Sequence, residues 1–396
     1  MDNSGATTSP HKIVDPIPKE KTIRLVKNKF TDAEDYLSKK YDFRRNVLSL
    51  EIEIKEKDEK IYRPVNENSL YRELQHKGNT ISLANILAIL RSDFVSDFDP
   101  IKNYFDNLKW NKESHIDKLA EFIKTNDPQE WKNHFKKHLV RSVKCALDND
   151  YFNKQALILI HAAQNSGKST FIRFLCPPEL VAYIAEDVTT DKDSRILLVK
   201  NFIINLDELD KFNKQEIAAV KSFISKNQIN ERLPFDRKNS VLKRRASFFG
   251  STNKNELLDD PTGSVRWLCF EIISIDWDYK KKIDINQVWA EAYDLYKKGF
   301  MCDMTREELE RNEERNTKFQ VLSIERELIQ NLFEPDPEKL FENFMTATEV
   351  LDKLTGRTNL SSKLNRVNVG KALTMLGFPD GRETKERISG YYLKLK

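Results

Sequence analysis

The chain has 396 residues, of which 39% are hydrophobic and 32% are charged, and its formal net charge is +4. This composition predicts a soluble globular protein of two or three domains, and so small a net charge does not by itself indicate a nucleic-acid partner. No apolar run approaches the ~20 residues needed to cross a bilayer, and Met1–Pro18 lacks the apolar core of a signal peptide. The four cysteines are far apart and the six histidines do not cluster. We therefore expect reduced thiols in a cytoplasmic protein, and neither a disulfide framework nor a zinc site.

The first 150 residues contain no catalytic pattern. Residues 1–25 are polar and without periodicity, which predicts a disordered tail, and residues 26–150 predict a mostly helical domain. Alternation over Arg44–Ile54 indicates a strand, with a hairpin partner at Lys60–Arg63. Helices are expected at Ser69–His76, at Leu83–Ser92 after the N-cap Ser82, and after Asp99-Pro100, Ser114 and Asp127-Pro128.

A strand, a loop and a helix are expected over residues 157–170, where an apolar run leads into a Gly-Lys-Ser-Thr cluster. This order is typical of a phosphate-binding P-loop, in which backbone N–H groups and the helix N-terminus face the phosphates. Lys168 would reach the β- and γ-phosphate oxygens, and Ser169 would offer its hydroxyl to Mg²⁺. The usual pattern has glycine where this chain has Ala162, and alanine tolerates only a modest version of the same tight turn. The predicted nucleotide-binding residues are Gln164, Asn165, Ser166, Gly167, Lys168, Ser169 and Thr170.

Two further apolar strands end in polar residues. The first, Asn201–Leu206, is followed by Asp207, expected near the metal, and by Glu208, expected to polarise the water that attacks the γ-phosphate. The other, Ala246–Thr252, is followed by Asn253, which could hold that water or read the γ-phosphate. The alternative is a surface Gly-Lys-Ser turn and a chance acidic turn after a core strand. The ordered series of strand ends favours an ATP hydrolase. Within this region a further strand is expected at Ile196–Val199 and a helix at Asn213–Ser225.

Basic residues are concentrated in two stretches. Residues 231–250 carry six basic side chains against two acidic ones, and residues 363–396 carry eight against three, which suggests polyanion contact at two places. The first stretch predicts a hairpin, with Ile229–Phe235 leading out, Asp236–Ser240 as the tip and Val241–Phe249 returning. The predicted DNA-binding residues are Arg237, Lys238 and Lys243. The alternative is an ordinary solvated turn.

The carboxyl-terminal quarter predicts a separate module. Residues 301–343 are charged and form a helical linker, and residues 344–396 combine two helices with a strand at Arg387–Leu395. Helices followed by a basic strand suggest a winged helix whose second helix, Asn365–Leu376, could enter a DNA groove. The alternatives are a small packing domain or a protein-docking module.

These motifs, in this order, resemble a superfamily 3 helicase, and more narrowly the virulence-associated protein E family of phages, satellites and integrated mobile elements. The similarity extends to Gly250-Ser251-Thr252-Asn253, to Arg232–Arg237, to Arg244-Arg245 and to residues 260–267. It implies an α/β P-loop core of the AAA+ kind over residues 151–300, between the helical domain and the winged-helix-like domain. It also implies that Arg266 reaches the γ-phosphate of a neighbouring subunit, although the family usually has Arg-Arg where this chain has Val265-Arg266.

The resemblance implies an ATP-dependent DNA helicase that replicates a mobile element in a bacterial or phage-infected cell. Its cofactors would be ATP and Mg²⁺. Its partners would be single-stranded or forked DNA in the pore of a homohexamer, and a separate primase or replication initiator. Two alternatives remain open: a P-loop switch that binds an origin without translocating, and an ATPase of a defence or regulatory system.

Overall fold

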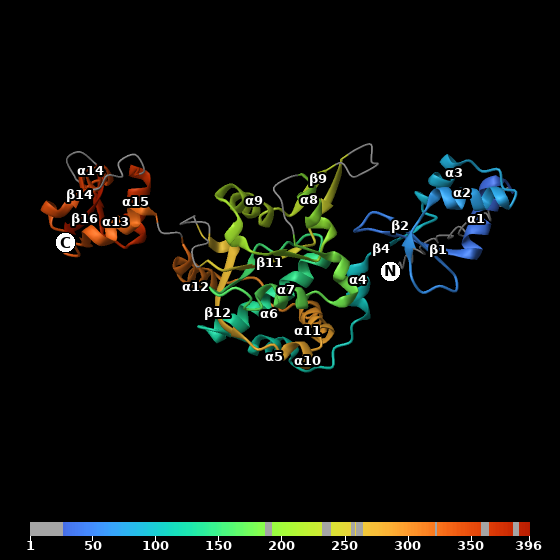
Figure 1. The fold of residues 1–396 in the computed structure, drawn as a ribbon, viewed down its shortest axis with the longest axis horizontal. Coiled ribbons are helices and arrows are strands. Elements are labelled where there is room, and N and C mark those ends of the chain that lie inside the picture. Colours follow the sequence, from blue (N-terminus) through green and yellow to red (C-terminus); the bar gives the residue numbers. More distant parts are fainter. Residues whose placement is uncertain are drawn as a thin grey trace, which may run out of the picture. The chain divides into compact units, whose positions relative to one another are not determined.

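The computed structural model describes residues 27–186, 192–231, 239–254, 258, 264–320, 323–357, 364–382 and 388–396 (Figure 1). The fold is mixed α/β, with helices and several sheets. The chain divides into two compact units, Met1–Phe98 and Asp99–Lys396. Among the described residues, no helix has both the length and the apolar character needed to cross a membrane.

The first unit is a four-stranded sheet, ordered β3-β2-β1-β4, with three helices. Its core includes Leu37, Ile54, Leu74, Ile86 and Leu90, all almost fully buried. The elements are α1 (Lys29–Lys40), β1 (Tyr41–Asn46), β2 (Ile52–Glu56), β3 (Arg63–Pro64), α2 (Glu67–His76), α3 (Leu83–Leu90) and β4 (Ser96–Phe98). The expected helices are confirmed, and Ser82 caps α3 through Asn85 N–H. The first unit therefore combines the expected helices with a small sheet.

The single strand expected over Arg44–Ile54 is wrong, because β1 and β2 are two antiparallel strands joined by a tight turn. Asn46 Oδ1 accepts hydrogen bonds from Leu48 N–H at 3.0 Å and Ser49 N–H at 3.1 Å, and Leu50 is left-handed, with φ +65°. An asparagine side chain can hold such a turn without glycine or proline. The alternation of apolar and polar residues therefore did not reveal the turn between β1 and β2.

A six-stranded sheet, ordered β5-β12-β6-β11-β8-β7, forms the centre of the second unit. Strands β12, β6, β11, β8 and β7 run parallel, and β5 is antiparallel to β12. The strands are β5 (Ile123–Thr125), β6 (Ala156–Ile160), β7 (Ile184–Ala185), β8 (Ile203–Leu206), β11 (Ser247–Thr252) and β12 (Trp267–Ile275). Because β11 lies between β6 and β8, the polar residues that follow these three strands emerge side by side at one edge.

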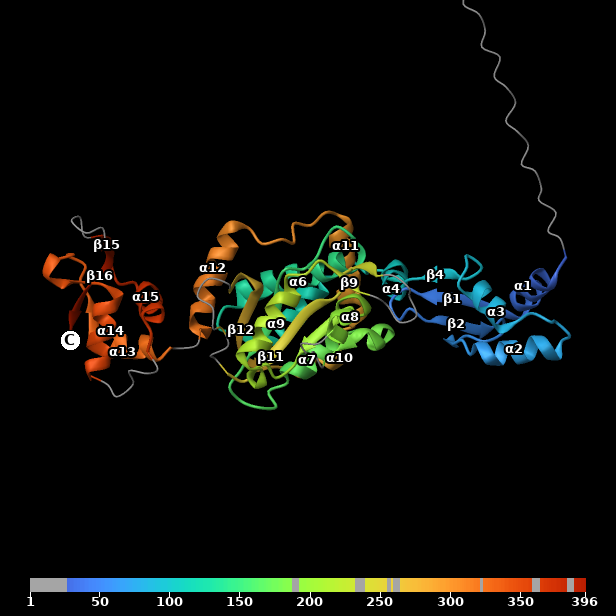
Figure 2. The same ribbon diagram turned by 90° about the horizontal axis from the view of Figure 1, so that it is seen from above.

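Helices cover both faces of this sheet, as the two ribbon views show (Figures 1 and 2). On one face Ile158, Ile204 and Phe248 pack in a buried cluster with side chains of α8 and α9. On the other face the ring of His138 from α6 lies 4.6 Å from that of Phe249, and α11 packs on α6. The helices of the region are α4 (Pro100–Asn107), α5 (His115–Glu121), α6 (Pro128–Leu147), α7 (Lys168–Leu175), α8 (Lys192–Lys200), α9 (Lys214–Ile224), α10 (Tyr279–Lys282), α11 (Ile285–Lys297) and α12 (Arg306–Asn316).

Two expectations for this region are wrong. The apolar run Ile196–Val199 belongs to helix α8, since four apolar residues fit a buried helix as well as a strand. The return strand of the basic hairpin is also shorter than expected. Strand β9 (Gln228–Glu231) pairs with β10 (Ser240–Lys243), and the chain then turns and enters the central sheet as β11. Residues 232–238, which include Asp236–Lys238 of the expected tip, lie outside the described residues, and Ser240, expected in the tip, begins β10.

The carboxyl-terminal elements form their own core of Ile329, Val350, Leu354, Val369 and Leu373. Here β16 pairs antiparallel with β13, β14 and β15. The elements are α13 (Ile324–Leu332), β13 (Phe333–Pro335), β14 (Phe344–Met345), α14 (Ala347–Arg357), α15 (Arg366–Met375), β15 (Asp380–Arg382) and β16 (Ser389–Leu395). The two expected helices and the last strand are confirmed. Helix α13, from the stretch expected to be a linker, packs into this core.

Candidate functional site

The loop after β6 turns into helix α7 through two left-handed residues. Asn165 has φ +56° and Gly167, the N-cap of α7, has φ +91°. The left-handed backbone thus falls at these positions and not at Ala162, so alanine is compatible with the turn there. Gly167 has no side chain to cap the helix. The first N–H groups of α7 consequently have no capping side chain, which is the arrangement that favours an anion at a helix N-terminus.

The Lys168 side chain is folded back into this loop and is only 5% exposed. Its Nζ donates to Asn253 Oδ1 at 2.9 Å, to Ser166 Oγ at 2.9 Å and to His161 O at 3.1 Å. Burial lowers the pKa of Lys168, although the nearby charges of Asp210 and Asp207 act in the opposite direction. The ammonium group therefore links the loop to the end of β11.

Asp207, directly after β8, accepts hydrogen bonds from two serine hydroxyls on different elements. Ser169 Oγ of α7 lies 2.5 Å from Asp207 Oδ1, and Ser251 Oγ of β11 lies 2.6 Å from the same atom. Burial alone would raise the pKa of Asp207, but the hydrogen bonds from the two serines and the charge of Arg173 outweigh it, and the pKa is lowered. The site thus holds an ionised carboxylate beside two hydroxyl oxygens.

Glu208 lies at the exposed margin of the same site. Its backbone is left-handed, with φ +51°, and its N–H donates to Asp207 Oδ1 at 3.0 Å. Its carboxylate pairs with Lys211. On the neighbouring strand, the N–H of Asn253 donates to Asp210 Oδ1 at 3.4 Å. The structure therefore brings Lys168, Ser169, Asp207, Glu208 and Asn253 together at the carboxyl edge of the sheet.

Sequence reasoning missed several polar residues in this network, among them Ser251, Arg173 and Glu186. Arg173 Nη2 donates to Asp207 Oδ2 at 3.2 Å, and Arg173 Nε donates to Glu186 Oε1 at 2.5 Å. Glu186 Oε1 also accepts from Asn205 Nδ2 at 3.1 Å. Arg173 lies four residues after Ser169 on α7, so helical spacing could have placed it on the same face. Glu186 had no such signal, because the two-residue strand β7 that precedes it was not predicted.

Arg266 lies away from this network in its own chain. Its Nε donates to Ser225 Oγ at 2.7 Å, at the C-cap of α9. The next residue, Trp267, pairs with Ala156, the first residue of β6, whereas the Lys168 loop follows Ile160 at the other end. Four residue steps of about 3.3 Å separate the two ends of β6 by about 13 Å. Arg266 is thus at the amino edge of the sheet and the Lys168 cluster at the carboxyl edge.

The basic stretch at 231–250 is only partly available to a ligand. Lys243 is partly exposed on β10, opposite Gln228, while Arg237 and Lys238 lie outside the described residues. Arg244 is 1% exposed and binds backbone carbonyl groups. Arg245 pairs with Asp99. The count of basic residues therefore overstated the surface charge, because two of the six have internal partners.

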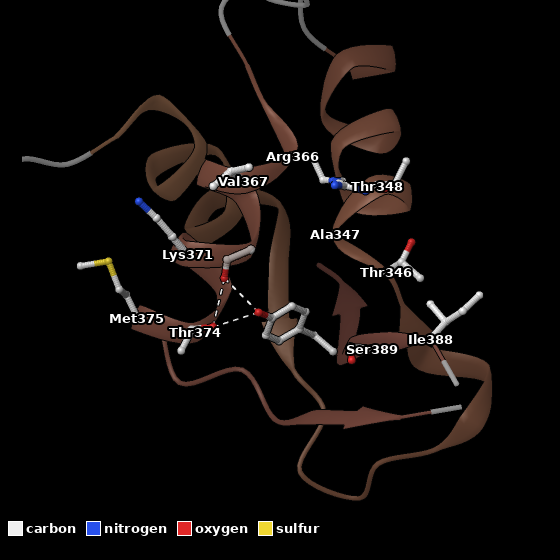
Figure 3. A pocket seen from close by; sticks show the side chains of 12 residues that line it. Thr346, Ala347, Thr348, Arg366, Val367, Lys371, Thr374, Met375, Ile388 and Ser389 are labelled. Carbon is white, nitrogen blue, oxygen red and sulfur yellow. Dashed lines mark hydrogen bonds between the residues drawn. The ribbon is translucent and has the colours of Figure 1, made fainter. Parts of the chain in front are cut away.

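A pocket of about 810 Å³ lies between α14, α15 and β16 (Figure 3). Helix α15 contributes Val367, which is 61% exposed, and Lys371 at its margin. Tyr391 OH lies 2.9 Å from Thr374 Oγ1 and donates to Gly370 O at 3.1 Å. The helix expected to enter a DNA groove thus has a mixed apolar and basic surface beside this hollow.

Comparison with known proteins gives both a fold and a family. Two apo structures of the NrS-1 C-terminal region (residues 305–718) each align with 93% of this chain and all of their own length, at a TM-score of 0.50. Their sequence identities are 13% and 14%, so this similarity concerns the fold alone. No curated protein sequence matches the chain. The virulence-associated protein E-like domain matches residues 105–321, more than half of the chain, and the protein therefore belongs to this family.

Proposed function

We propose that the protein is an ATP-dependent, ring-forming DNA helicase that acts in the replication of a mobile genetic element. One observation carries this proposal: Lys168, Ser169, Asp207 and Asn253 converge from α7, β8 and β11 at the carboxyl edge of a parallel sheet. Ligands of open α/β sheets bind outside this edge, where the strand order reverses. Membership in the virulence-associated protein E-like family supports the mobile-element setting.

The phosphates of ATP would bind across the N-terminus of α7. Lys168 has to release its internal acceptors and turn to the β- and γ-phosphate oxygens, whose charge exceeds that of the amide and hydroxyl oxygens it contacts now. Asn253 loses its lysine partner in the same step and can then hydrogen-bond the γ-phosphate or the attacking water. The mutual contact of Lys168 and Asn253 thus closes the site until a phosphate replaces it.

The donor set fits Mg²⁺. Asp207 supplies a carboxylate, and the hydroxyl groups of Ser169 and Ser251 lie within 2.6 Å of its Oδ1. Mg²⁺ prefers such oxygen ligands and is often held by one or two carboxylates together with substrate phosphates. When bound, the ion would neutralise charge that develops on the phosphates. Ser169 and Asp207 would hold it, and Glu208 would orient the water.

The proposed DNA contacts come from the basic hairpin and the carboxyl-terminal module. Lys243 is partly exposed on β10. Arg237 and Lys238 lie in the sequence between β9 and β10. A positively charged element that moves with the nucleotide state could grip successive phosphates, which would couple hydrolysis to translocation. In the carboxyl-terminal module, α15 and β16 would contact duplex DNA as the recognition helix and the wing of a winged helix.

The experiment is an unwinding assay on a forked DNA duplex with ATP and Mg²⁺, combined with a hydrolysis assay. We expect wild-type protein to do both, Lys168→Ala to do neither, and Glu208→Gln to bind ATP but hydrolyse it at least about 100-fold more slowly. Lys39→Ala, an exposed lysine in the first unit, is the matched control and should behave as wild type.

The outcomes separate the proposal from its alternatives. Hydrolysis without unwinding on any forked substrate would favour an origin-binding switch or a regulatory ATPase. If both Lys168→Ala and Glu208→Gln hydrolyse ATP at the wild-type rate, the proposed nucleotide site is wrong.

A further inference from the structure

The ring of Trp277 lies against Gly167 in the Gln164–Thr170 loop. Strand β12 continues past its pairing with β6 to Ile275, and Trp277 follows two residues later. A Cβ atom at Gly167 would lie 2.8 Å from Cζ2 and 2.9 Å from Cη2 of the Trp277 ring. The edge of the indole therefore rests on the glycine that caps α7, and no other residue type fits there without moving the ring.

The ring is held in position but is not buried. Asp276 N–H donates to Phe122 O at 2.8 Å, and Tyr279 packs into α7, with its ring 5.4 Å from Phe171 and 4.8 Å from Phe174. Both flanks of Trp277 are thus anchored, yet its side chain stays 47% exposed. Three of the five tryptophans of the chain, Trp131, Trp267 and Trp289, are instead fully buried. An exposed aromatic ring with a fixed backbone offers a π face to a ligand at little entropic cost.

A nucleotide bound across the edge of the sheet would have its base near the Trp277 ring. The γ-phosphate end faces Asp207 and Asn253, which follow β8 and β11 on one side of β6. The other end of the molecule then points to the opposite side of β6, where β12 lies and Trp277 follows it. Lys280 Nζ, 4.8 Å from the centroid of the Trp277 ring, is on an exposed side chain that can move aside or contact the ribose.

We propose that Trp277 is the stacking platform for the nucleobase of the bound nucleoside triphosphate. This inference rests on the proposed nucleotide site and adds the subsite for the base. Stacking accepts any base that presents a π face. We therefore expect purine triphosphates to bind with similar affinity, and pyrimidine triphosphates, with their smaller rings, to bind more weakly.

The test compares two ligands, ATP and inorganic tripolyphosphate, each with Mg²⁺, by calorimetry or competition. Tripolyphosphate has the phosphates and lacks the base. Base stacking predicts that Trp277→Ala weakens ATP binding about 10-fold or more and leaves tripolyphosphate binding unchanged. Trp277→Phe should retain most of the ATP affinity, whereas Trp277→Leu, which keeps an apolar contact with Gly167 but has no aromatic face, should resemble Trp277→Ala. Trp110→Ala, in another half-buried tryptophan, is the control and should change neither affinity.

Each outcome has a distinct meaning. If Trp277→Leu and Trp277→Ala lose affinity equally for ATP and for tripolyphosphate, the ring only supports the loop. If Trp277→Ala binds ATP as wild type does, the base lies elsewhere. Either result overturns the proposal. If wild-type protein binds neither ligand, and Lys168→Ala is no different, the proposed nucleotide site itself fails.

Discussion

At position 244 an arginine is almost completely buried between the central sheet and α9. Its guanidinium donates to Ala246 O at 2.8 Å, to Ile224 O at 2.6 Å and to Asn153 O at 2.9 Å. Burial lowers its pKa, but arginine remains charged at any ordinary pH. The side chain thus fixes three separate segments where β10 ends and β11 begins.

We expect Arg244→Met to lower the free energy of unfolding by about 3 kcal/mol or more, because several buried carbonyl groups lose their donor. Chemical denaturation monitored by circular dichroism measures this change. Arg306→Met is the matched control: its side chain is 92% exposed and pairs with Glu310 on the same helix, so the expected change is below about 0.5 kcal/mol. Equal stability of the two variants would contradict a structural role for Arg244.

Whether a single residue could be predicted depended on how local its signal was. Lys168, Ser169 and Asp207 could be placed at one edge of the sheet because each follows or begins an element whose type was evident from the sequence. Arg244 could not, since a charge count does not distinguish an exposed arginine from one whose donors are all satisfied internally. Trp277 could not either, because its contact with Gly167 exists only once β12 lies beside β6.

At the scale of elements, helix starts were predicted best. Asp99 and Asp127 accept hydrogen bonds from the first turns of α4 and α6, as their Asp-Pro sequences indicate. These signals are contained within four residues. The errors at Ile196–Val199 and at the hairpin return involve segments whose structure depends on distant partners, and no local pattern specifies a tertiary partner.

Helix α6 holds two buried histidines that should make the protein sensitive to acid. Burial lowers the pKa of His134 to about 3, with the charges of Arg315 and Arg141 acting in the same direction. His138 is fully buried, its Nε2 lies 3.1 Å from Phe248 O, and burial also lowers its pKa. In the unfolded chain both would titrate near the ordinary value of about 6.5. The unfolded state therefore binds these protons first as the pH falls.

Because the folded-state pKa values are lowered, the stability contributed by the neutral histidines is complete above about pH 6.5 and is lost as the pH falls below it. The loss for His134 should continue towards pH 3, at up to about 1.4 kcal/mol per pH unit for each histidine. Denaturant titrations between pH 7.5 and 4.5 measure the slope. In His134→Gln the free energy of unfolding should change less steeply with pH, by the equivalent of about one proton. An unchanged slope in this variant would show that protonation of His134 does not contribute to the loss of stability. His115→Gln, in a partly exposed histidine, is the control.

For the whole molecule, the mixed α/β class and the family could be recognised from the sequence, and the expected hexamer stays a prediction. The relevant geometry lies in the central sheet. Arg266 is at its amino edge, beside Ser225, and the Lys168 cluster is at its carboxyl edge. In one chain these two features lie at opposite edges of the sheet, so Arg266 does not reach the Lys168 cluster of its own chain. The proposed action of Arg266 at the site of a neighbouring subunit is compatible with this placement and stays a prediction.

Mixing two inactive variants tests this arrangement. Arg266→Ala subunits keep an intact Lys168, and Lys168→Ala subunits keep an intact Arg266. Alone, each variant should hydrolyse ATP at least about 100-fold more slowly than wild type, because loss of a trans arginine leaves transition-state charge uncompensated. In a random equimolar ring, roughly a quarter of the interfaces join an intact Lys168 to an intact Arg266, and hydrolysis should partly return.

The control concerns the hydrogen bond that Arg266 makes to Ser225 Oγ at 2.7 Å. If Arg266 only secures the end of α9, then Ser225→Ala should lower hydrolysis as much as Arg266→Ala does, and mixing should restore nothing. If Arg266 acts in trans, Ser225→Ala should remain active, because it frees the guanidinium without removing it. Light scattering must show that both variants assemble and exchange subunits. Mixed assemblies without any recovered activity would show that Arg266 does not act at the site of a neighbouring subunit.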